Sequence, residues 1–80
     1  MTKYKRLTKN GSKIIYSFET LDGTGTFSID ENDFSVTLLT TKCYLKNKEM
    51  DEKTLKKVLY YGAKKIKELN FPENCIYATH

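Results

Sequence analysis

Three turn signals, about 10 to 12 residues apart, constrain the fold of this chain more than any other feature. Asn10-Gly11 and Asp22-Gly23 each separate two runs of strand-forming residues, and a third polar turn centres on Glu31-Asn32. Asn-Gly and Asp-Gly favour type I′ turns, because Asn and Asp tolerate positive φ and Gly adopts it freely. Closely spaced turns of this kind predict an antiparallel meander of short strands.

Apolar and polar side chains alternate between these turns. Since successive strand residues point to opposite faces, the apolar positions should line one face of the sheet. Those positions are Ile14, Tyr16, Phe18, Phe27, Ile29, Phe34, Val36 and Leu38. The other face is mostly Ser, Thr and acidic residues, as an antiparallel sheet with one solvated face allows. Residues 41–48 fit a strand or a loop, and we favour a short strand extension over 43–46.

The strongest helix signal covers residues 51–69. Asp51 suits the N-cap position, where its carboxylate would accept a hydrogen bond from an unpaired amide of the first turn. Asn70 suits a left-handed cap, and Pro72 prevents the helix from continuing. Residues 74–80 then predict a final strand that joins the sheet.

The predicted fold class is therefore α+β: an antiparallel β-meander of four to five strands, one helix packed on one face, and a short C-terminal strand. A chain of 80 residues supports one domain, 1–80, with a single two-layer core. No apolar run approaches the ~18 residues of a membrane span, and the N-terminus lacks the apolar stretch of a secretion signal. We therefore expect a cytoplasmic protein that does not enter the membrane.

The two faces of the predicted helix differ sharply. One is an apolar arc, formed by Leu55, Val58, Leu59, Gly62, Ile66 and Leu69. Gly62 lies in the middle of this arc, where it costs roughly 1 kcal/mol relative to alanine. We therefore expect a close approach to a large ring of the sheet, such as Tyr16 or Phe18. The opposite face carries the candidate partner-binding residues: Lys53, Lys56, Lys57, Tyr60, Lys64 and Lys67.

A lysine-rich helix face is most often ordinary solvated surface. Such a face usually mixes both charges, however, and here only Glu52 and Glu68 offset five lysines. Tyr60 at its centre has no packing role in this register, whereas Tyr61 falls at the core boundary. Lysines around an exposed aromatic ring suit phosphate binding with base stacking, or the centre of a protein interface.

Residues that could support catalysis or metal binding are sparse. Cys43 and Cys75 lack metal-site spacing, so we expect two reduced thiols. The only histidine, His80, ends the chain, which is a poor position for a catalytic base. The acidic and amide residues of the turns are explained by turn geometry. We therefore expect no enzyme, no catalytic residue, no metal site and no cofactor.

The sequence favours a small non-catalytic binding protein. The preferred interpretation is a protein-binding inhibitor or adaptor of bacterial, phage or mobile-element origin, for example an anti-defence inhibitor. It would dock on a host or cognate protein through the basic helix face. The origin rests only on a composition rich in Lys, Asn, Ile and Tyr, which is typical of AT-rich genomes.

The alternative is a nucleic-acid-binding module that uses the same lysine and tyrosine face, assisted by the basic N-terminal strand. Three features weigh against it: a net charge of only +4, the acidic block at 19–33, and a helix without arginine. Arginine is preferred for bidentate contacts to phosphates and bases, and this chain has only Arg6. The oligomeric state is left open by the sequence.

Overall fold

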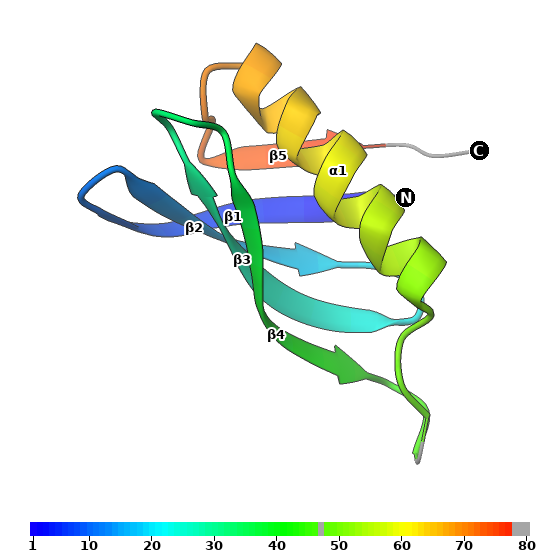
Figure 1. The fold of residues 1–80 in the computed structure, drawn as a ribbon. Coiled ribbons are helices and arrows are strands. Elements are labelled where there is room, and N and C mark those ends of the chain that lie inside the picture. Colours follow the sequence, from blue (N-terminus) through cyan, green and yellow to red (C-terminus); the bar gives the residue numbers. More distant parts are fainter. Residues whose placement is uncertain (47, 78–80) are drawn as a thin grey trace.

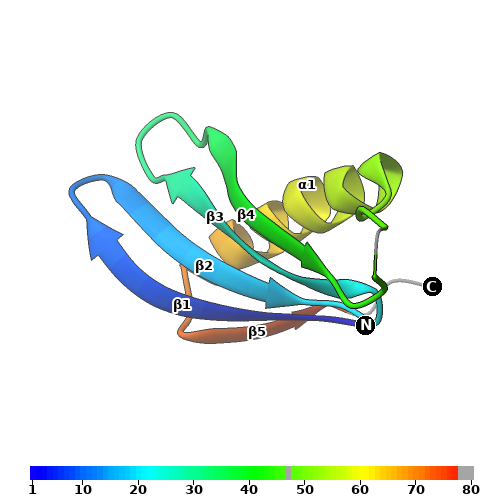
Figure 2. The same ribbon diagram turned by 90° about the horizontal axis from the view of Figure 1, so that it is seen from below.

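The computed structural model describes residues 1–46 and 48–77 and confirms the predicted α+β architecture. In chain order the elements are β1 (Thr2–Asn10), β2 (Lys13–Glu19), β3 (Gly23–Asp30), β4 (Val36–Cys43), α1 (Glu52–Glu68) and β5 (Asn74–Tyr77). The strands form one antiparallel sheet in the order β4-β3-β2-β1-β5. Helix α1 crosses one face of this sheet, and the other face is open (Figures 1 and 2).

The core lies between α1 and the covered face of the sheet. It is built around Phe27, whose ring centroid is 5.9 Å from that of Tyr4 and 6.0 Å from those of Tyr16 and Phe18. All four rings are buried, together with the Ile29 side chain. The predicted apolar faces of β2 and β3 are thus the two strand faces that the helix covers.

The first two turns form where predicted but without the expected type I′ geometry. The first reversal occupies Gly11 and Ser12, and only Gly11 has a positive φ, of 63°, as in a type II′ turn. The second is held by Thr20, whose hydroxyl accepts hydrogen bonds from the amides of Asp22 and Gly23 at 3.1 and 3.2 Å. The Thr20 hydroxyl thus stabilises this loop, in which neither Asp22 nor Gly23 has a positive φ.

Strand β4 departs most from the predicted pattern. Phe34 precedes it, in the turn, and has a left-handed φ of 57°. The strand ends at Cys43, so the predicted extension over 43–46 reaches only its first residue. Val36 lies on the covered face, but Leu38 is 39% exposed because α1 does not reach that far over β4.

Helix α1 begins and ends as predicted. The Asp51 carboxylate accepts a hydrogen bond from a first-turn amide at 3.2 Å. At the other end Asn70 has a φ of 60°, and its amide donates to the Lys67 carbonyl at 3.0 Å. The Phe71 amide donates to the Ile66 carbonyl at 2.9 Å, which completes a Schellman motif.

Burial along α1 follows the predicted arc, with one exception. Ile66 is completely buried, and Leu55 and Leu59 are partly buried against the core. The prediction that Leu69 belongs to the core is wrong, since its side chain is 49% exposed. Leu69 is the C-cap residue, and the chain is already turning away from the sheet there.

Gly62 does allow a close approach, but the ring above it belongs to Tyr4 and not to Tyr16 or Phe18. A Cβ at Gly62 would overlap the Tyr4 hydroxyl and ring. The Tyr4 hydroxyl passes beneath the helix and donates a hydrogen bond to the Val58 carbonyl at 2.6 Å. The missing side chain therefore lets a buried tyrosine tie β1 to the helix backbone.

The C-terminal strand forms, as predicted, on the far side of β1. It covers Asn74–Tyr77, and the predicted continuation over 78–80 lies outside the described residues. Cys75 in β5 and Cys43 in β4 occupy opposite edges of the sheet, and both are free thiols. Burial raises the pKa of the Cys75 thiol, so it is kept protonated.

Candidate docking site

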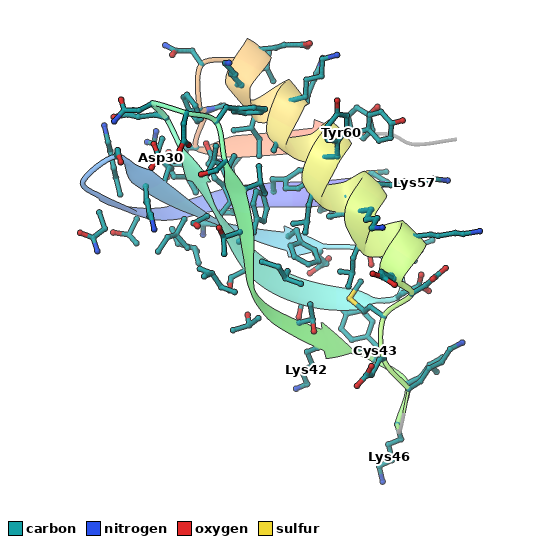
Figure 3. All side chains as sticks on the ribbon, in the orientation of Figure 1. Asp30, Lys42, Cys43, Lys46, Lys57 and Tyr60 are labelled. Carbon is teal, nitrogen blue, oxygen red and sulfur yellow. The ribbon has the colours of Figure 1, made fainter. Side chains whose placement is uncertain are left out.

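Figure 3 shows two of the predicted candidate residues, Lys57 and Tyr60, pointing from α1 away from the sheet. All six are exposed: Lys53, Lys56, Lys57, Tyr60, Lys64 and Lys67. The Tyr60 side chain is 67% exposed, and its ring packs edge-on against Tyr61 with centroids 5.4 Å apart. The exposure predicted for Lys56, Tyr60 and Lys64 is therefore confirmed, whereas Tyr61, which was expected at the core boundary, is 47% exposed.

Two adjoining hollows lie between α1 and β4. The first, of about 520 Å³, is lined by Phe34, Val36, Lys56, Leu59 and Tyr60. The second, of about 500 Å³, is lined by Phe34, Tyr60, Lys64, Lys67 and Glu68. Because Phe34 and Tyr60 line both, the two hollows adjoin, and we call them together the β4-side groove.

Phe34 is held in the groove by the turn that precedes β4. The Asp30 carboxylate accepts from the Asn32 amide and the Asp33 carboxylate from the Ser35 amide, both at 2.9 Å. The second of these bonds favours the charged form and lowers the pKa of Asp33. The Lys67 ammonium lies 4.5 Å from the centroid of the Phe34 ring, within the range of a cation–π interaction.

The structure divides the six candidate residues into two groups. Tyr60 lies in the groove together with Lys56, Lys64 and Lys67. Lys57 instead lines a different hollow, on the β1 and β5 side of the helix. Lys53 lines neither half of the groove. Of the five predicted lysines, three therefore lie at the rim of the groove, and Lys53 and Lys57 lie outside it.

Sequence reasoning missed three groove residues, because strand alternation assigned Phe34 and Val36 to the core and the helical period assigned Leu59 to it. They are only partly buried, since the helix axis crosses the strands and uncovers β4. One signal was present: Phe34 directly follows a run of four polar turn residues. A large aromatic residue so close to a turn often lies at the margin of a core.

The opposite flank of α1 is closed by hydrogen bonds from buried tyrosines. Besides the bond from Tyr4, the Tyr16 hydroxyl donates to the Pro72 carbonyl at 2.7 Å. Burial disfavours the phenolate and raises the pKa of Tyr16 to about 12, although the nearby Arg6 partly opposes this. Burial likewise raises the pKa of Tyr4. These hydroxyls therefore act as structural donors to backbone carbonyls.

The N-terminal lysines do not extend the groove rim. Lys3 and Lys5 pair with Glu19 and Ser17 on β2, which places them on the open face of the sheet, opposite α1. Lys9 lies on the helix side but forms an ion pair with Glu31 at 3.1 Å. The basic N-terminal strand and the basic helix face are therefore separate surfaces.

Within residues 1–46 and 48–77, no three His, Cys, Asp or Glu side chains are placed to hold a metal ion. None of the helical segments described is long and apolar enough to cross a membrane. Chemically, the β4-side groove offers an apolar floor, cationic rim groups and one exposed aromatic ring. Comparison with models of protein families, with curated proteins and with solved structures finds no match to this chain.

Proposed function

We propose that this chain is a non-catalytic protein-binding protein, an inhibitor or adaptor, that docks on an acidic partner through the β4-side groove. The observation that carries the proposal is the combination of Phe34, Val36 and Leu59 in the floor with three lysines at the rim. Apolar anchors fill such a floor, and carboxylates of the partner meet the lysines.

Tyr60 is the residue that we expect to dominate binding. It lines both halves of the groove and is 67% exposed, so a partner would bury a large ring that is already oriented by Tyr61. Tyrosine is enriched among the interface residues whose truncation to alanine loses the most binding free energy. Its ring contributes a large contact area at little cost in conformational entropy. The rim lysines then steer association and select acidic surfaces.

A nucleic acid is the second candidate, because the lysines extend over 14 residues and Tyr60 could stack on a base. Two features favour protein instead. The groove floor is apolar, whereas a phosphate backbone needs donors along its path. The helix also has no arginine to make bidentate contacts with phosphates.

The test is affinity capture from a lysate of the source organism, with and without nuclease, using two variants of equal charge and size change. The groove variant carries Tyr60→Ala, Lys56→Glu and Lys64→Glu. Its matched control carries Tyr44→Ala, Lys3→Glu and Lys5→Glu, which alter an exposed tyrosine and two lysines elsewhere. We expect a captured protein that resists nuclease, is lost with the groove variant and is retained by the control.

Two results would contradict the proposal. Retention of the partner by the groove variant would show that the site lies on another surface. Loss of the partner on nuclease treatment would favour nucleic acid, and binding to an oligonucleotide should then weaken with salt. For about four lysine contacts, log K should fall against log salt with a slope of about −3 to −4.

A further inference from the structure

The free edge of β4 adjoins the β4-side groove. Both β4 and β5 are edge strands of the sheet, but β5 has four residues and β4 has eight. Proteins usually protect long edge strands with several charges, proline or a covering element. Strand β4 has only Lys42 and a bulge at Leu39, and six of its eight residues are exposed. Its outer edge is thus open to pairing.

The hydrogen-bond register shows which backbone groups face this edge. The Asp30 amide donates to the Ser35 carbonyl at 2.9 Å, so Ser35 points its carbonyl toward β3. In an antiparallel pair, alternate residues face the neighbouring strand. Thr37 therefore faces β3 as well, whereas Val36 and Leu38 direct their N–H and C=O groups outward.

The same register shows to which face of the sheet the β4 side chains point. Val36 pairs with Ile29 and Leu38 with Phe27, so both point to the helix side of the sheet. A residue added opposite Val36 would point the same way, because paired residues share a face. Its side chain would enter the groove between Phe34 and Leu59. A sixth strand would thus gain backbone hydrogen bonds and a side-chain pocket at one position.

The lysines around the groove indicate which side chains an added strand should carry. Lys56 stands beside the Val36 end of the groove, and Lys64 and Lys67 stand beside Phe34. If the added strand runs antiparallel to β4, its C-terminal residues pass Phe34 and approach these two lysines. A second copy of this chain fits poorly, because β4-to-β4 pairing would bring two lysine rims together.

We propose that the β4 edge and the β4-side groove together bind an extended acidic segment of the partner as an additional antiparallel strand. This inference rests on the proposed function and specifies how the partner engages the groove. Apolar side chains of the segment fill the space beside Phe34, and acidic residues at its C-terminal end meet Lys64 and Lys67. Pairing with Val36 and Leu38 supplies sequence-independent affinity, and the groove supplies specificity.

The probe is a capped ten-residue peptide in which valine and threonine alternate, followed by phenylalanine and three glutamates. Its matched control has three lysines in place of the glutamates. We expect the acidic peptide to bind the wild-type chain and the lysine peptide to bind at least about tenfold more weakly. Equal binding of both peptides, or no binding of the acidic one, would overturn the proposal.

An edge proline separates strand pairing from docking on the helix alone. Leu38→Pro removes an outward N–H without removing a hydrogen bond to β3. Thr41→Pro is the matched control, because its N–H also points outward but lies beyond the bulge and away from the groove. Leu38→Ala controls for the lost side chain. We expect only Leu38→Pro to weaken peptide binding by about tenfold or more.

Amide exchange on the wild-type chain gives a reading that does not depend on any variant. Pairing should slow exchange at Val36 and Leu38 when the acidic peptide is bound, whereas docking on the helix alone would leave both amides unchanged.

The docking-site proposal and the strand-addition proposal can be contradicted independently of each other. A partner lost with the Tyr60→Ala groove variant but kept by Leu38→Pro would support the docking site and overturn strand addition. A dimer that Leu38→Pro dissociates would overturn the acidic occupant.

Discussion

The two flanks of α1 meet the same sheet in opposite ways. On the β1 side, Tyr4 reaches under Gly62 and bonds to the Val58 carbonyl, so helix and sheet are in direct contact there. On the β4 side, Leu59 is only partly buried and the groove remains between helix and strand. One flank is closed by hydrogen bonds and close packing, and the other leaves apolar surface uncovered.

This difference separates stability from recognition. Residues on the closed flank leave little surface for a partner, whereas residues on the open flank contribute less to the core. A chain of 80 residues has one small core and can hardly leave apolar area exposed on both flanks. We therefore expect mutations on the closed flank to affect folding and mutations on the open flank to affect binding.

The largest effect should come from Ile66→Ala. Ile66 is completely buried, so its truncation should reduce the free energy of unfolding by about 2–5 kcal/mol. Leu59→Ala, on the open flank, should cost only about 1–2 kcal/mol, because part of its side chain already contacts water. Urea denaturation of both variants measures the difference, and a larger loss for Leu59→Ala would reverse the assignment of the flanks.

Gly62→Ala tests the closed flank directly. Overpacking against Tyr4 costs about 1–3 kcal/mol and weakening of its hydrogen bond about 1 kcal/mol, offset by ~1 kcal/mol of helix propensity. The net loss should be about 1–3 kcal/mol. Combining it with Tyr4→Phe, which removes the overlapping hydroxyl, should cost less than the sum of the single changes. Strict additivity in denaturation experiments would show that the two residues do not compete for space.

The closed flank was only partly predictable from the sequence. The helical period and the apolar arc indicated that Gly62 faces the sheet, and the cost of a buried glycine indicated a close approach. The partner, Tyr4, was not predictable, because β1 carries only two apolar residues, Tyr4 and Leu7, whose spacing of three gives no alternation signal. Its position depends on the order of strands in the sheet, which no local pattern contains.

The open flank was harder to predict for a related reason. The lysines and Tyr60 follow from the helical period alone, and their exposure is confirmed. The groove floor depends instead on the angle between α1 and the strands, which leaves Phe34 and Val36 partly uncovered. That angle is set by the packing of the whole core, so the sequence pattern could only assign both residues to the buried face.

Alkaline pH should loosen the closed flank first. The folded-state pKa of Tyr16 is about 12, above its ordinary value of 10, so the folded chain retains a proton that the unfolded chain releases. The contribution of the Tyr16 phenol to the free energy of unfolding is fully present below about pH 10. It is lost as the pH rises from about 10 to about 12. Tyr16→Phe should reduce the loss of thermal stability across this range, and Tyr4, whose pKa is also raised, should account for a remaining loss. An unchanged pH dependence in that variant would mean that another group controls alkaline unfolding.

The smallest effect distinguishes lysines of the groove from those outside it. Lys53 lies in the first turn of α1, three and four residues before Lys56 and Lys57, so it is repelled by both and by the positive helix N-terminus. Lys53→Glu replaces these repulsions with attractions and should stabilise the chain by about 0.3–1 kcal/mol, measured by thermal denaturation at low salt. Because Lys53 lines neither half of the groove, partner binding should stay within about twofold of wild type. Lys64→Glu makes the same charge change inside the groove and should weaken binding at least about tenfold while altering stability little. Equal loss of binding in the two variants would show that the whole helix face acts as one charged surface and that the groove has no special role.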